Sequence, residues 1–337
     1  MKALQIKKYG EIREGLAFEN VDKPKIQNKD ILIAVKAASI NPIDYKIVEG
    51  KLKDMLTLNL PITIGYDVSG VVVEKGVNVS NFEIGDEVYA RVPQEQMGTV
   101  AEFVAVNNEL VSLKPENISF EQASGLPLTG LTAIQALESV GIKEGDRILI
   151  HAGSGGVGSF AIQYAKAKGA IVYTTTSTKN VDWVKALGAD RVIDYKTENY
   201  KEVANNLDIV FDTLGDDYTF DAFEIIKVGG KVTTIVGPPD KETAKQMGMT
   251  DYKLPEKLLK LIEEKSAVYK LTWMQPNKKQ LNDIKIMVEN GTINPIVDLI
   301  YPFEDGIDAV EYLATGRAKG KVIISLADNS LGLSQLT

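Results

Sequence analysis

A glycine-rich segment between an apolar run and a helical pattern constrains the fold of this chain more than any other feature. Residues Ile148–Ile150 predict a buried strand, and residues 159–168 predict a helix. Gly153, Gly155 and Gly158 lie between them with the spacing G-x-G-x-x-G. Such glycines allow a tight turn and let backbone N–H groups approach a pyrophosphate, whose charge the helix N-terminus stabilises. The segment therefore predicts a dinucleotide-binding strand, turn and helix.

The composition excludes several kinds of active site. The 337 residues include no cysteine and one histidine, His151, so thiolate nucleophiles and Cys-ligated zinc are excluded. The net charge of −8 argues against a nucleic-acid surface, and no apolar run is long enough to span a bilayer. We therefore expect a cytoplasmic protein with no membrane or nucleic-acid partner, whose chemistry comes from a bound organic cofactor.

The first part of the chain, to about residue 125, is rich in strand patterns. Its strand-like segments are short, contain many β-branched residues and are separated by glycine turns, which is typical of an antiparallel, barrel-like sheet. The predicted strands are residues 30–40, 67–74, 87–92 and 100–106.

After Pro127 strands and helices alternate, which predicts an α/β domain with a doubly wound parallel sheet. The predicted strands are residues 147–151, 171–175, 192–194, 209–212, 231–236 and 267–272. The predicted helices are residues 157–168, 181–187, 219–227 and 255–264.

The tail from about residue 294 returns to a different pattern. It predicts a strand over residues 296–301, a helix over 304–315 and a final strand over 321–324. We expect this tail to rejoin the first domain. The predicted domains are therefore residues 1–125 with 294–337, and residues 126–293.

Six motifs in this order resemble the medium-chain dehydrogenase/reductase superfamily, and more narrowly its zinc-free quinone oxidoreductase and 2-alkenal reductase branch. The resemblance covers nearly the whole chain and implies a GroES-like β-barrel domain that carries substrate and catalytic groups, plus a Rossmann domain that binds NADP(H). The motifs lie at residues 39–46, 64–72, 126–133, 152–158, 187–195 and 316–322.

The end of the second predicted strand of the parallel sheet carries no carboxylate, although an NAD site usually places one there to bind the ribose hydroxyls. Instead it carries Ser177, Thr178 and Lys179, whose hydroxyls and positive charge suit a 2′-phosphate. The resemblance adds Tyr195 as a contact to that phosphate. Asn180 occupies the position where relatives often have lysine, which leaves Lys179 displaced by one residue. We expect NADP(H), although a solvated polar turn has the same composition.

The resemblance implies further cofactor contacts in both domains. Thr129 and Thr132 match positions that contact nicotinamide, although either hydroxyl could instead bond to its own helix backbone. We interpret His151 as structural. The remaining implied cofactor residues are Lys46, Gly155, Gly156, Val157, Leu214, Val236, Gly237, Gly320 and Lys321.

The reaction class follows from the absence of a zinc site. Gly65-Tyr66-Asp67 occupies the position where zinc-dependent members have Gly-His-Glu, so we expect no catalytic metal. Without a Lewis acid, reduction of an activated C=C bond is easier than alcohol oxidation, because hydrogen-bond donors can stabilise the enolate. We expect hydride transfer from NADPH to a 2-alkenal, an enone or a quinone.

The candidate catalytic residues lie in the first domain. Lys46 matches the family lysine that reaches the cofactor and the substrate carbonyl; its alternative is an exposed surface lysine. Asn41 and Tyr66 are expected to line the same cleft, although Asn41 could cap a helix and Tyr66 could pack in the core. Asp44 and Asp67 have no basic partner that the sequence identifies, so we expect structural roles for them.

Two other functions remain open on sequence alone. One is a one-electron quinone reductase, and the other is an NADPH-binding protein with little turnover that acts through partners. The polar segment 238–254 is expected to form a long loop that covers the substrate. The apolar sixth strand of the parallel sheet, within residues 267–273, could pair edge to edge in a homodimer.

Overall fold

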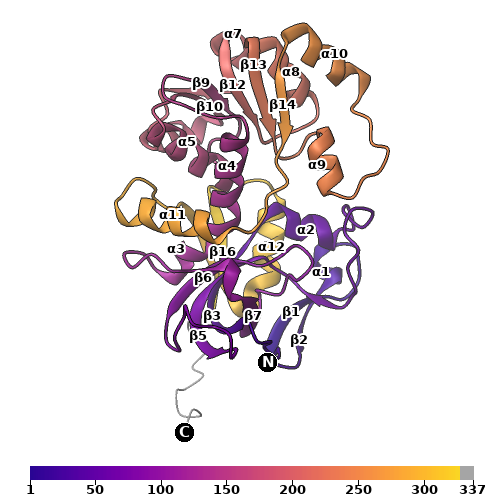
Figure 1. Ribbon diagram of the computed structural model, residues 1–337, viewed down its shortest axis with the longest axis vertical. Helices are drawn as coiled ribbons and strands as arrows, with labels where there is room; N and C mark the ends of the chain where they lie inside the picture. Colours follow the sequence, from indigo (N-terminus) through magenta and orange to yellow (C-terminus); the bar gives the residue numbers. More distant parts are fainter. Residues whose placement is uncertain (327–337) are drawn as a thin grey trace. The chain divides into compact units, whose positions relative to one another are not determined.

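The structure of the chain is a computed structural model that describes residues 1–326 (Figure 1). The described residues divide into two compact units. The first unit comprises residues 1–128, 276–290 and 295–326, and the second comprises residues 129–275 and 291–294. The predicted domain ranges differ from these units chiefly at residues 276–290, and residues 327–337 of the predicted range lie outside the described residues.

The second unit is built on a six-stranded parallel sheet with the strand order β11-β10-β9-β12-β13-β14. The order reverses between β9 and β12, so the sheet is doubly wound, as the sequence predicted. The strands are β9 (Arg147–Ile150), β10 (Ile171–Thr176), β11 (Arg191–Asp194), β12 (Leu207–Asp212), β13 (Ile226–Thr234) and β14 (Val268–Leu271).

Several helices of the second unit pack on this sheet, around a core that includes Leu149, Val210 and Phe223. Several boundaries differ from the prediction, and the largest difference is at β13, which was predicted from residue 231 and starts at Ile226. The helix expected to end at residue 227 therefore ends at Ile225. The helices are α4 (Pro127–Ser139), α5 (Gly156–Ala167), α6 (Val181–Ala186), α7 (Tyr200–Val203), α8 (Asp217–Ile225), α9 (Lys241–Gln246), α10 (Glu256–Lys265) and the 3₁₀ helix η2 (Thr178–Asn180).

The first unit contains a seven-stranded sheet centred on one long strand, β3. One edge of β3 pairs with β5, while residues 30–34 pair with β7 and residues 37–40 pair with β16. The pairs are antiparallel as predicted, except that β15 runs parallel to β16. The strands are β3 (Asp30–Ile40), β5 (Asp67–Lys75), β6 (Glu87–Arg91), β7 (Phe103–Asn107), β8 (Val111–Leu113), β15 (Val297–Pro302) and β16 (Lys321–Ser325).

Short elements complete the first unit, and several of them were not predicted. A small antiparallel sheet has the order β2-β1-β4, in which β4 has only two residues. These elements are β1 (Lys2–Ile6), β2 (Leu16–Asn20), β4 (Ile62–Thr63), α1 (Ile12–Gly15), α2 (Pro42–Val48), α3 (Phe120–Ser124), α12 (Gly306–Ala314) and the 3₁₀ helices η1 (Asn108–Leu110) and η3 (Phe303–Asp305).

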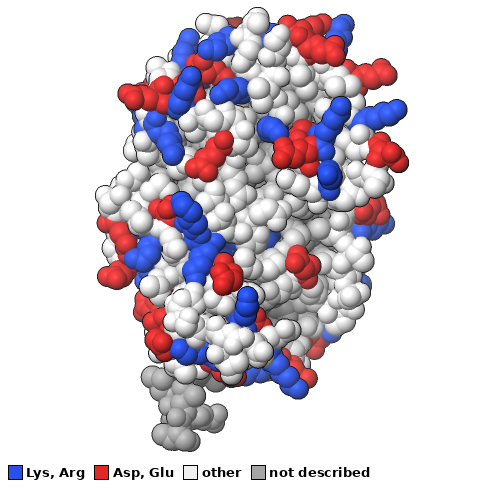
Figure 2. Space-filling model, viewed as in Figure 1, with Lys and Arg blue, Asp and Glu red and all other residues white. Residues whose placement is uncertain are grey.

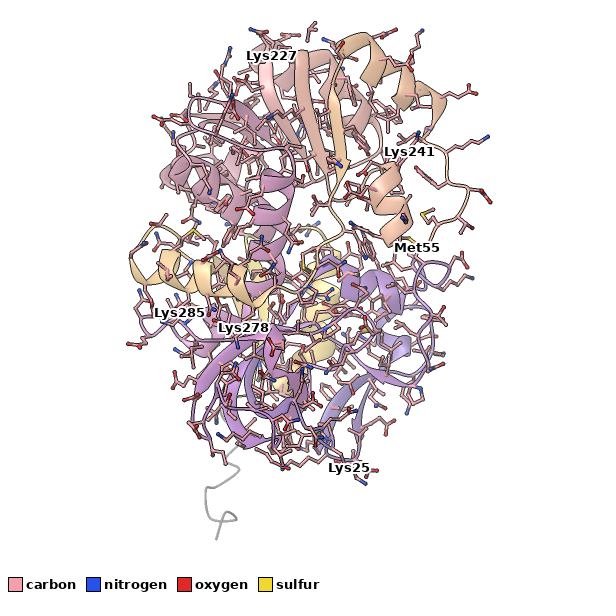
Figure 3. The ribbon with its side chains drawn as sticks, viewed as in Figure 1. Lys25, Met55, Lys227, Lys241, Lys278 and Lys285 are labelled. Carbon is pink, nitrogen blue, oxygen red and sulfur yellow. The ribbon has the colours of Figure 1, made fainter. Side chains whose placement is uncertain are left out.

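The helix α11 (Lys278–Glu289), marked by Lys278 and Lys285 in Figure 3, was not predicted and belongs to the first unit. The Tyr89 hydroxyl donates to the Leu281 carbonyl at 2.6 Å, and the Ser112 hydroxyl donates to the Asn282 side chain at 2.5 Å. These bonds tie α11 to β6 and β8. Its buried residues, Leu281, Ile284 and Val288, recur at helical spacing, a signal that the sequence did contain.

The surface carries charges of both signs. On the face shown in Figure 2, basic and acidic side chains are interspersed. None of the helices within residues 1–326 has the length and apolar character that crossing a membrane requires.

Candidate active site

The glycine turn between β9 and α5 has the geometry of a phosphate-binding loop. An added Cβ at Gly153 would lie 2.2 Å from the Thr174 hydroxyl, and one at Gly158 would lie 2.3 Å from the Ala152 carbonyl oxygen. At Gly155 the nearest atom, the same Ala152 oxygen, would be 3.4 Å away, which is ordinary contact. Packing therefore requires the first and third glycines, whereas the second borders open space.

The first residues of α5 add the donors that an anion needs. Gly155 is the N-cap of this 12-residue helix, and Gly156 and Val157 are its first two residues. The first N–H groups of a helix have no partner within the helix, and its dipole favours negative charge there. The open side of Gly155 and these N–H groups together fit a pyrophosphate. They include three of the predicted cofactor residues.

At the end of β10 the side chain of Lys179 is exposed, whereas the side chain of Asn180, the next residue, is buried. Thr178 and Lys179 are exposed, whereas Ser177 and Asn180 are buried. The Asn180 amide donates to the Ser177 hydroxyl at 3.2 Å, and its oxygen accepts from the indole of Trp183 at 3.1 Å. The side chain at position 180 is therefore buried, and Lys179 is the residue of this turn whose ammonium is exposed to a ligand.

Tyr195 lies beside the same strand end. Its backbone N–H donates to the Thr176 carbonyl at 3.1 Å, which joins the residue after β11 to the last residue of β10. The Tyr195 side chain is 56% exposed. The Thr176 hydroxyl is buried and has no hydrogen-bond partner among the described residues. The structure thus brings Lys179 and Tyr195 to adjacent strand ends, where both side chains face solvent.

Asp212, which the sequence did not single out, organises the ends of β12 and β13. Its buried carboxylate accepts hydrogen bonds from the Leu214 backbone N–H at 2.9 Å and the Thr234 hydroxyl at 3.0 Å. Thr234 in turn accepts from the Gly237 N–H at 3.0 Å. These bonds hold the two strand ends so that Leu214 and Val236 remain 41% and 43% exposed. Both apolar residues lie where cofactors bind in doubly wound sheets.

Thr129 and Thr132 lie near the start of α4, and both are nearly buried. Residues three apart share one helix face, so the structure places these two predicted nicotinamide contacts side by side.

His151 is a buried residue at the end of β9. Its Nδ1 lies 3.3 Å from the Thr175 hydroxyl, and the rings of Tyr200 and Tyr218 approach the imidazole edge to face at 5.0 and 5.2 Å. Burial lowers the pKa of His151 to about 4, so the ring is neutral at physiological pH. This environment supports the structural interpretation.

The buried imidazole predicts an acid-sensitive contribution to stability. Between pH 6.5 and about 4 the unfolded chain binds a proton at His151 that the folded chain excludes, so the contribution falls as the pH is lowered. The full loss amounts to about 3 kcal/mol. Urea unfolding of wild type and His151→Gln, followed by tryptophan fluorescence, should show the wild type gaining stability relative to the variant as pH rises from 4 to 6.5. A constant difference would contradict this.

A buried polar cluster in the first unit surrounds Asp67. The Asp67 carboxylate accepts from the Ser39 hydroxyl and the Asn41 amide, both at 2.9 Å, and lies 3.4 Å from the Lys321 ammonium. Its other oxygen accepts from the Leu128 backbone N–H at 2.9 Å. Asp67 thus has a basic partner that the sequence did not identify. Its partner lies 254 residues further along the chain, beyond the reach of local sequence patterns.

Asn41 and Lys321 are held tightly within this cluster. They are 1% and 5% exposed, and the Lys321 ammonium donates to the Asn41 side-chain oxygen. Burial lowers the pKa of Lys321, while Asp67 and Asp44 act in the opposite direction. Gly320, just before Lys321, has a φ of +77°, and a Cβ there would lie 2.3 Å from a backbone oxygen. Glycine is therefore required at this position.

Asp44 and Tyr66 are buried next to the Asp67 cluster. Asp44 accepts from the Asn41 backbone N–H at 2.7 Å, and burial raises its pKa to about 7. The Tyr66 hydroxyl donates to the Gln94 backbone carbonyl and accepts from the Gln94 side-chain amide, both at 3.1 Å. The Arg91 guanidinium lies 4.7 Å from the Tyr66 ring centre. Tyr66 thus fills the core, one of the alternatives that the sequence left open.

Lys46 occupies the last turn of α2 and is half-buried. Its ammonium has neither a hydrogen bond nor an ion pair with any residue that the structure describes. Of the residues predicted in the first unit, the structure therefore brings Asn41 and Lys321 into one cluster and leaves Lys46 as an available cation.

The segment 238–254 is more ordered than a long loop. It contains the helix α9, whose N-cap, Asp240, accepts from the Leu271 backbone N–H at 2.9 Å. The Tyr269 hydroxyl donates to the Pro238 carbonyl at 2.6 Å. The predicted loop therefore contains a short helix that the sequence did not predict, and these bonds attach its start to β14. Its predicted role as a lid stays a prediction.

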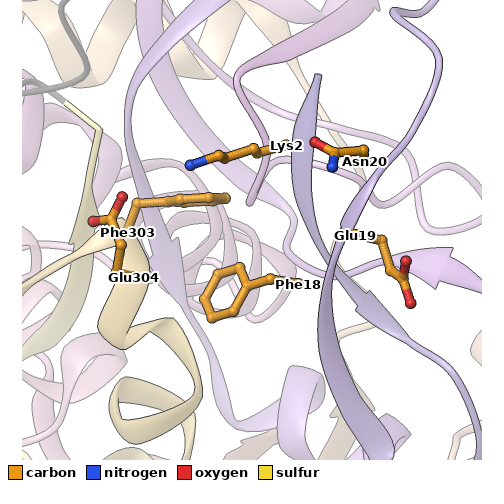
Figure 4. A pocket seen from close by; sticks show the side chains of 6 residues that line it. All are labelled: Lys2, Phe18, Glu19, Asn20, Phe303 and Glu304. Carbon is orange, nitrogen blue, oxygen red and sulfur yellow. The ribbon is translucent and has the colours of Figure 1, made fainter.

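A pocket of about 270 Å³ in the first unit is separate from these residues (Figure 4). Phe18 and Phe303 form its apolar part, with ring centres 5.2 Å apart, and none of its lining residues was predicted as a site residue. Its lining residues are Lys2, Phe18, Glu19, Asn20, Phe303 and Glu304.

Comparisons with known proteins match both units. The profile of the alcohol dehydrogenase GroES-like domain matches residues 27–116, and that of the zinc-binding dehydrogenases matches residues 187–324. The chain is 36% identical to the NADPH-dependent alkenal/one oxidoreductase of Arabidopsis thaliana, over 96% of this chain and 79% of that protein. The same identity and coverage relate it to the 2-methylene-furan-3-one reductase of Solanum lycopersicum.

Solved structures give the same relationship. The quinone oxidoreductase of Coxiella burnetii superposes with a TM-score of 0.85 at 34% identity, over 97% of this chain and 99% of that one. The second matched profile is named after zinc, yet this chain contains no cysteine and has Tyr66 and Asp67 where zinc-dependent members have His and Glu. The chain therefore belongs to the medium-chain dehydrogenase/reductase family, in its zinc-independent quinone oxidoreductase and alkenal reductase branch.

Proposed function

We propose that this protein is an NADPH-dependent oxidoreductase that reduces an α,β-unsaturated carbonyl compound, a 2-alkenal or an enone, or a quinone. The observation that carries the proposal is the pairing of two features in one unit. The glycine turn is open at Gly155 beside the N-terminus of α5, and the exposed side chains of Lys179 and Tyr195 follow the adjacent ends of β10 and β11, with no carboxylate at the end of β10. Relatives named as an alkenal/one oxidoreductase and a quinone oxidoreductase support the substrate class.

The residues fit the cofactor in the following roles. The N–H groups of Gly156 and Val157 would bind the pyrophosphate, and Lys179 and Tyr195 would bind the 2′-phosphate. Leu214 and Val236, together with Gly237 and the two threonines of α4, would hold the ring systems. Bound NADPH supplies a hydride.

The substrate residues act on the charge that develops during the reaction. When a hydride adds to the β-carbon of an enone, the electron pair of the C=C bond moves toward the carbonyl oxygen and gives an enolate. Lys46 would donate a hydrogen bond to that oxygen. This hydrogen bond would stabilise the transition state more than the ground state, because negative charge develops on the oxygen during the reaction. The α-carbon then takes a proton from solvent. For a quinone, the same donor would stabilise the hydroquinone anion.

The test of this function is a set of initial rates of NADPH and NADH oxidation with metal-free protein. The acceptors are a 2-alkenal, an enone and two quinones, with a chelator present. The expected result is NADPH-selective turnover of the alkenal or the enone. Radical products with oxygen uptake would instead identify a one-electron quinone reductase. Tight NADPH binding without turnover on any acceptor would identify a binding protein.

Reversal of the charge at Lys179 should change the cofactor preference. Lys179→Glu places a carboxylate beside the 2′-phosphate, so kcat/KM with NADPH should fall about a hundredfold while kcat/KM with NADH changes little. The matched control is Lys185→Glu, an exposed lysine of α6. An equal loss with both cofactors would assign the 2′-phosphate to other residues.

We also propose a homodimer and a cytoplasmic location. The edge strand β14, with Val268 exposed, supports dimer formation through the second unit, because an unpaired strand edge offers backbone partners to a second copy. Light scattering of Val268→Lys against wild type tests the dimer. Fractionation of the cells that express the protein tests the location, since some relatives are named as chloroplastic or mitochondrial.

A further inference from the structure

The turn after β10 contains a chain of side-chain hydrogen bonds that runs from Trp183 on α6 through Asn180 to Ser177. The Trp183 indole donates to the Asn180 side-chain oxygen at 3.1 Å, and the Asn180 amide donates to the Ser177 hydroxyl oxygen at 3.2 Å. Ser177 and Asn180 are 8% and 5% exposed. The chain thus ends on a hydroxyl directly after β10, at the edge where doubly wound sheets bind their ligands.

We propose that Asn180 is a positioning residue that makes the Ser177 hydroxyl a hydrogen-bond donor to the 2′-phosphate of NADPH, whereas the hydroxyl of Thr178 takes no part. The inference rests on the proposed function, because the ligand is the proposed cofactor. Asn180 and Trp183 are assigned no contact with NADPH. All of these residues belong to the second unit.

The first step of the argument is the direction of the hydrogen bonds. An indole N–H can only donate, so the atom of Asn180 that faces Trp183 is the amide oxygen. The amide NH₂ group then faces Ser177, and this group also can only donate. The Ser177 oxygen is therefore the acceptor of this bond, and its own proton points elsewhere.

The second step is the proton of Ser177. Ser177 is the N-cap residue of η2, yet its side chain makes no capping hydrogen bond. Within residues 1–326 no atom accepts a hydrogen bond from the Ser177 hydroxyl. A hydroxyl that already accepts a hydrogen bond is a better donor, because the bonds of a chain polarise one another. Ser177 is therefore a prepared donor for an acceptor from outside the protein, such as a phosphate oxygen.

The third step separates Ser177 from its neighbour Thr178. Thr178 is the more exposed of the two, but its hydroxyl donates to the carboxylate of Asp194, the last residue of β11. This bond is the largest of the effects that hold the pKa of Asp194 below its usual value, so its acceptor is a charged carboxylate. A phosphate would have to compete with that carboxylate for the Thr178 proton, whereas the Ser177 proton is available.

The test compares two ligands that differ only in the 2′-phosphate, adenosine 2′,5′-bisphosphate and 5′-AMP, by calorimetric titration of the full chain. The ratio of their Kd values isolates the contribution of the 2′-phosphate, because a variant that only loosens the fold weakens both ligands alike. In Ser177→Ala this ratio should fall about tenfold, as expected for a lost hydrogen bond to a charged group. The matched control, Thr178→Val, should keep the ratio of the wild type.

Two variants test the positioning role. Asn180→Leu removes the amide at similar size. If that variant does not fold, Trp183→Phe decides the case, because without the indole the Asn180 oxygen can turn to Ser177 and accept its proton. Each should lower the Kd ratio. Neither should lower it further in a protein that already carries Ser177→Ala, because residues that act through one atom are not additive.

NMR of the indole N–H gives a readout that a merely structural role would not change. The chain has two tryptophans, Trp183 and Trp273, and the Trp183 signal is assigned by its loss in Trp183→Phe. The bisphosphate should shift the Trp183 indole signal through the polarised chain, whereas 5′-AMP should not. In Ser177→Ala the shift should disappear.

Three results would overturn the proposal. They are an unchanged Kd ratio in Ser177→Ala, an equal loss in Thr178→Val, and additive effects of Trp183→Phe and Ser177→Ala. If the wild type binds both ligands equally, the proposed preference for NADPH is wrong, and the role of Ser177 with it. If the wild type prefers the bisphosphate and Ser177→Ala keeps that preference, only the present inference is wrong.

Discussion

Alanine at Gly155 is expected to weaken NADPH binding about a hundredfold without unfolding the protein. The added Cβ would meet only the Ala152 carbonyl oxygen, at 3.4 Å, and the backbone at Gly155 is in the extended region that any residue adopts. The protein therefore has room for the methyl group. The methyl group would, however, occupy the space through which the pyrophosphate approaches the N–H groups of α5.

Alanine at Gly158 provides the matched comparison. Its Cβ would lie 2.3 Å from the Ala152 carbonyl oxygen and 2.9 Å from the Gly153 Cα, both backbone atoms that cannot move aside. This variant should lose about 1–3 kcal/mol of unfolding free energy as well as NADPH binding. Fluorescence titration with NADPH and urea unfolding separate the two effects.

The pair distinguishes a binding loop from a glycine-rich connection. If Gly155→Ala binds NADPH as wild type does and folds normally, the open space beside α5 is not the pyrophosphate site. If both variants lose stability to the same extent, the second glycine serves packing like the third, and its loss of binding carries no information about the ligand.

The sequence predicted the second unit well because its signals are local. Within residues 147–167, the strand β9, the three glycines and α5 each carry their own pattern, and the alternation of strands with helices predicts a doubly wound sheet. The exposed end of β10 was also readable, since hydroxyls and a lysine stand where a carboxylate is usual. Only the structure shows that Asn180 is buried and Lys179 exposed.

The first unit was less predictable because its contacts are distant in sequence. The Asp67–Lys321 pair joins β5 to the last strand, so neither residue alone shows its partner. The role of Asp212 was not predicted for a related reason. It depends on a hydroxyl of β13 and an N–H group of the turn after β12, which no local pattern around Asp212 indicates. The two-residue strand β4 is too short for a period-two pattern to be recognised.

Methionine at Lys46 is expected to lower kcat/KM for a 2-alkenal about a hundredfold, with little change in stability. Lys46 is half-buried on α2 and has no partner among the residues described, so its removal breaks no interaction of the folded protein. Methionine keeps most of the length of the stem. The loss should therefore reflect the missing donor to the enolate oxygen.

The matched control is Lys51→Met, an exposed lysine that pairs with Glu49 at 2.7 Å just after the same helix. An exposed pair contributes little, so this variant should retain activity and stability. A separate NADPH titration of Lys46→Met divides the effect, because a loss confined to kcat places Lys46 on the reacting oxygen, whereas an equal loss in NADPH affinity makes it chiefly a cofactor ligand. Wild-type kinetics in Lys46→Met would mean that this cation is only a surface lysine, and the enolate would then need a different donor, for which Lys321 is the next residue to replace.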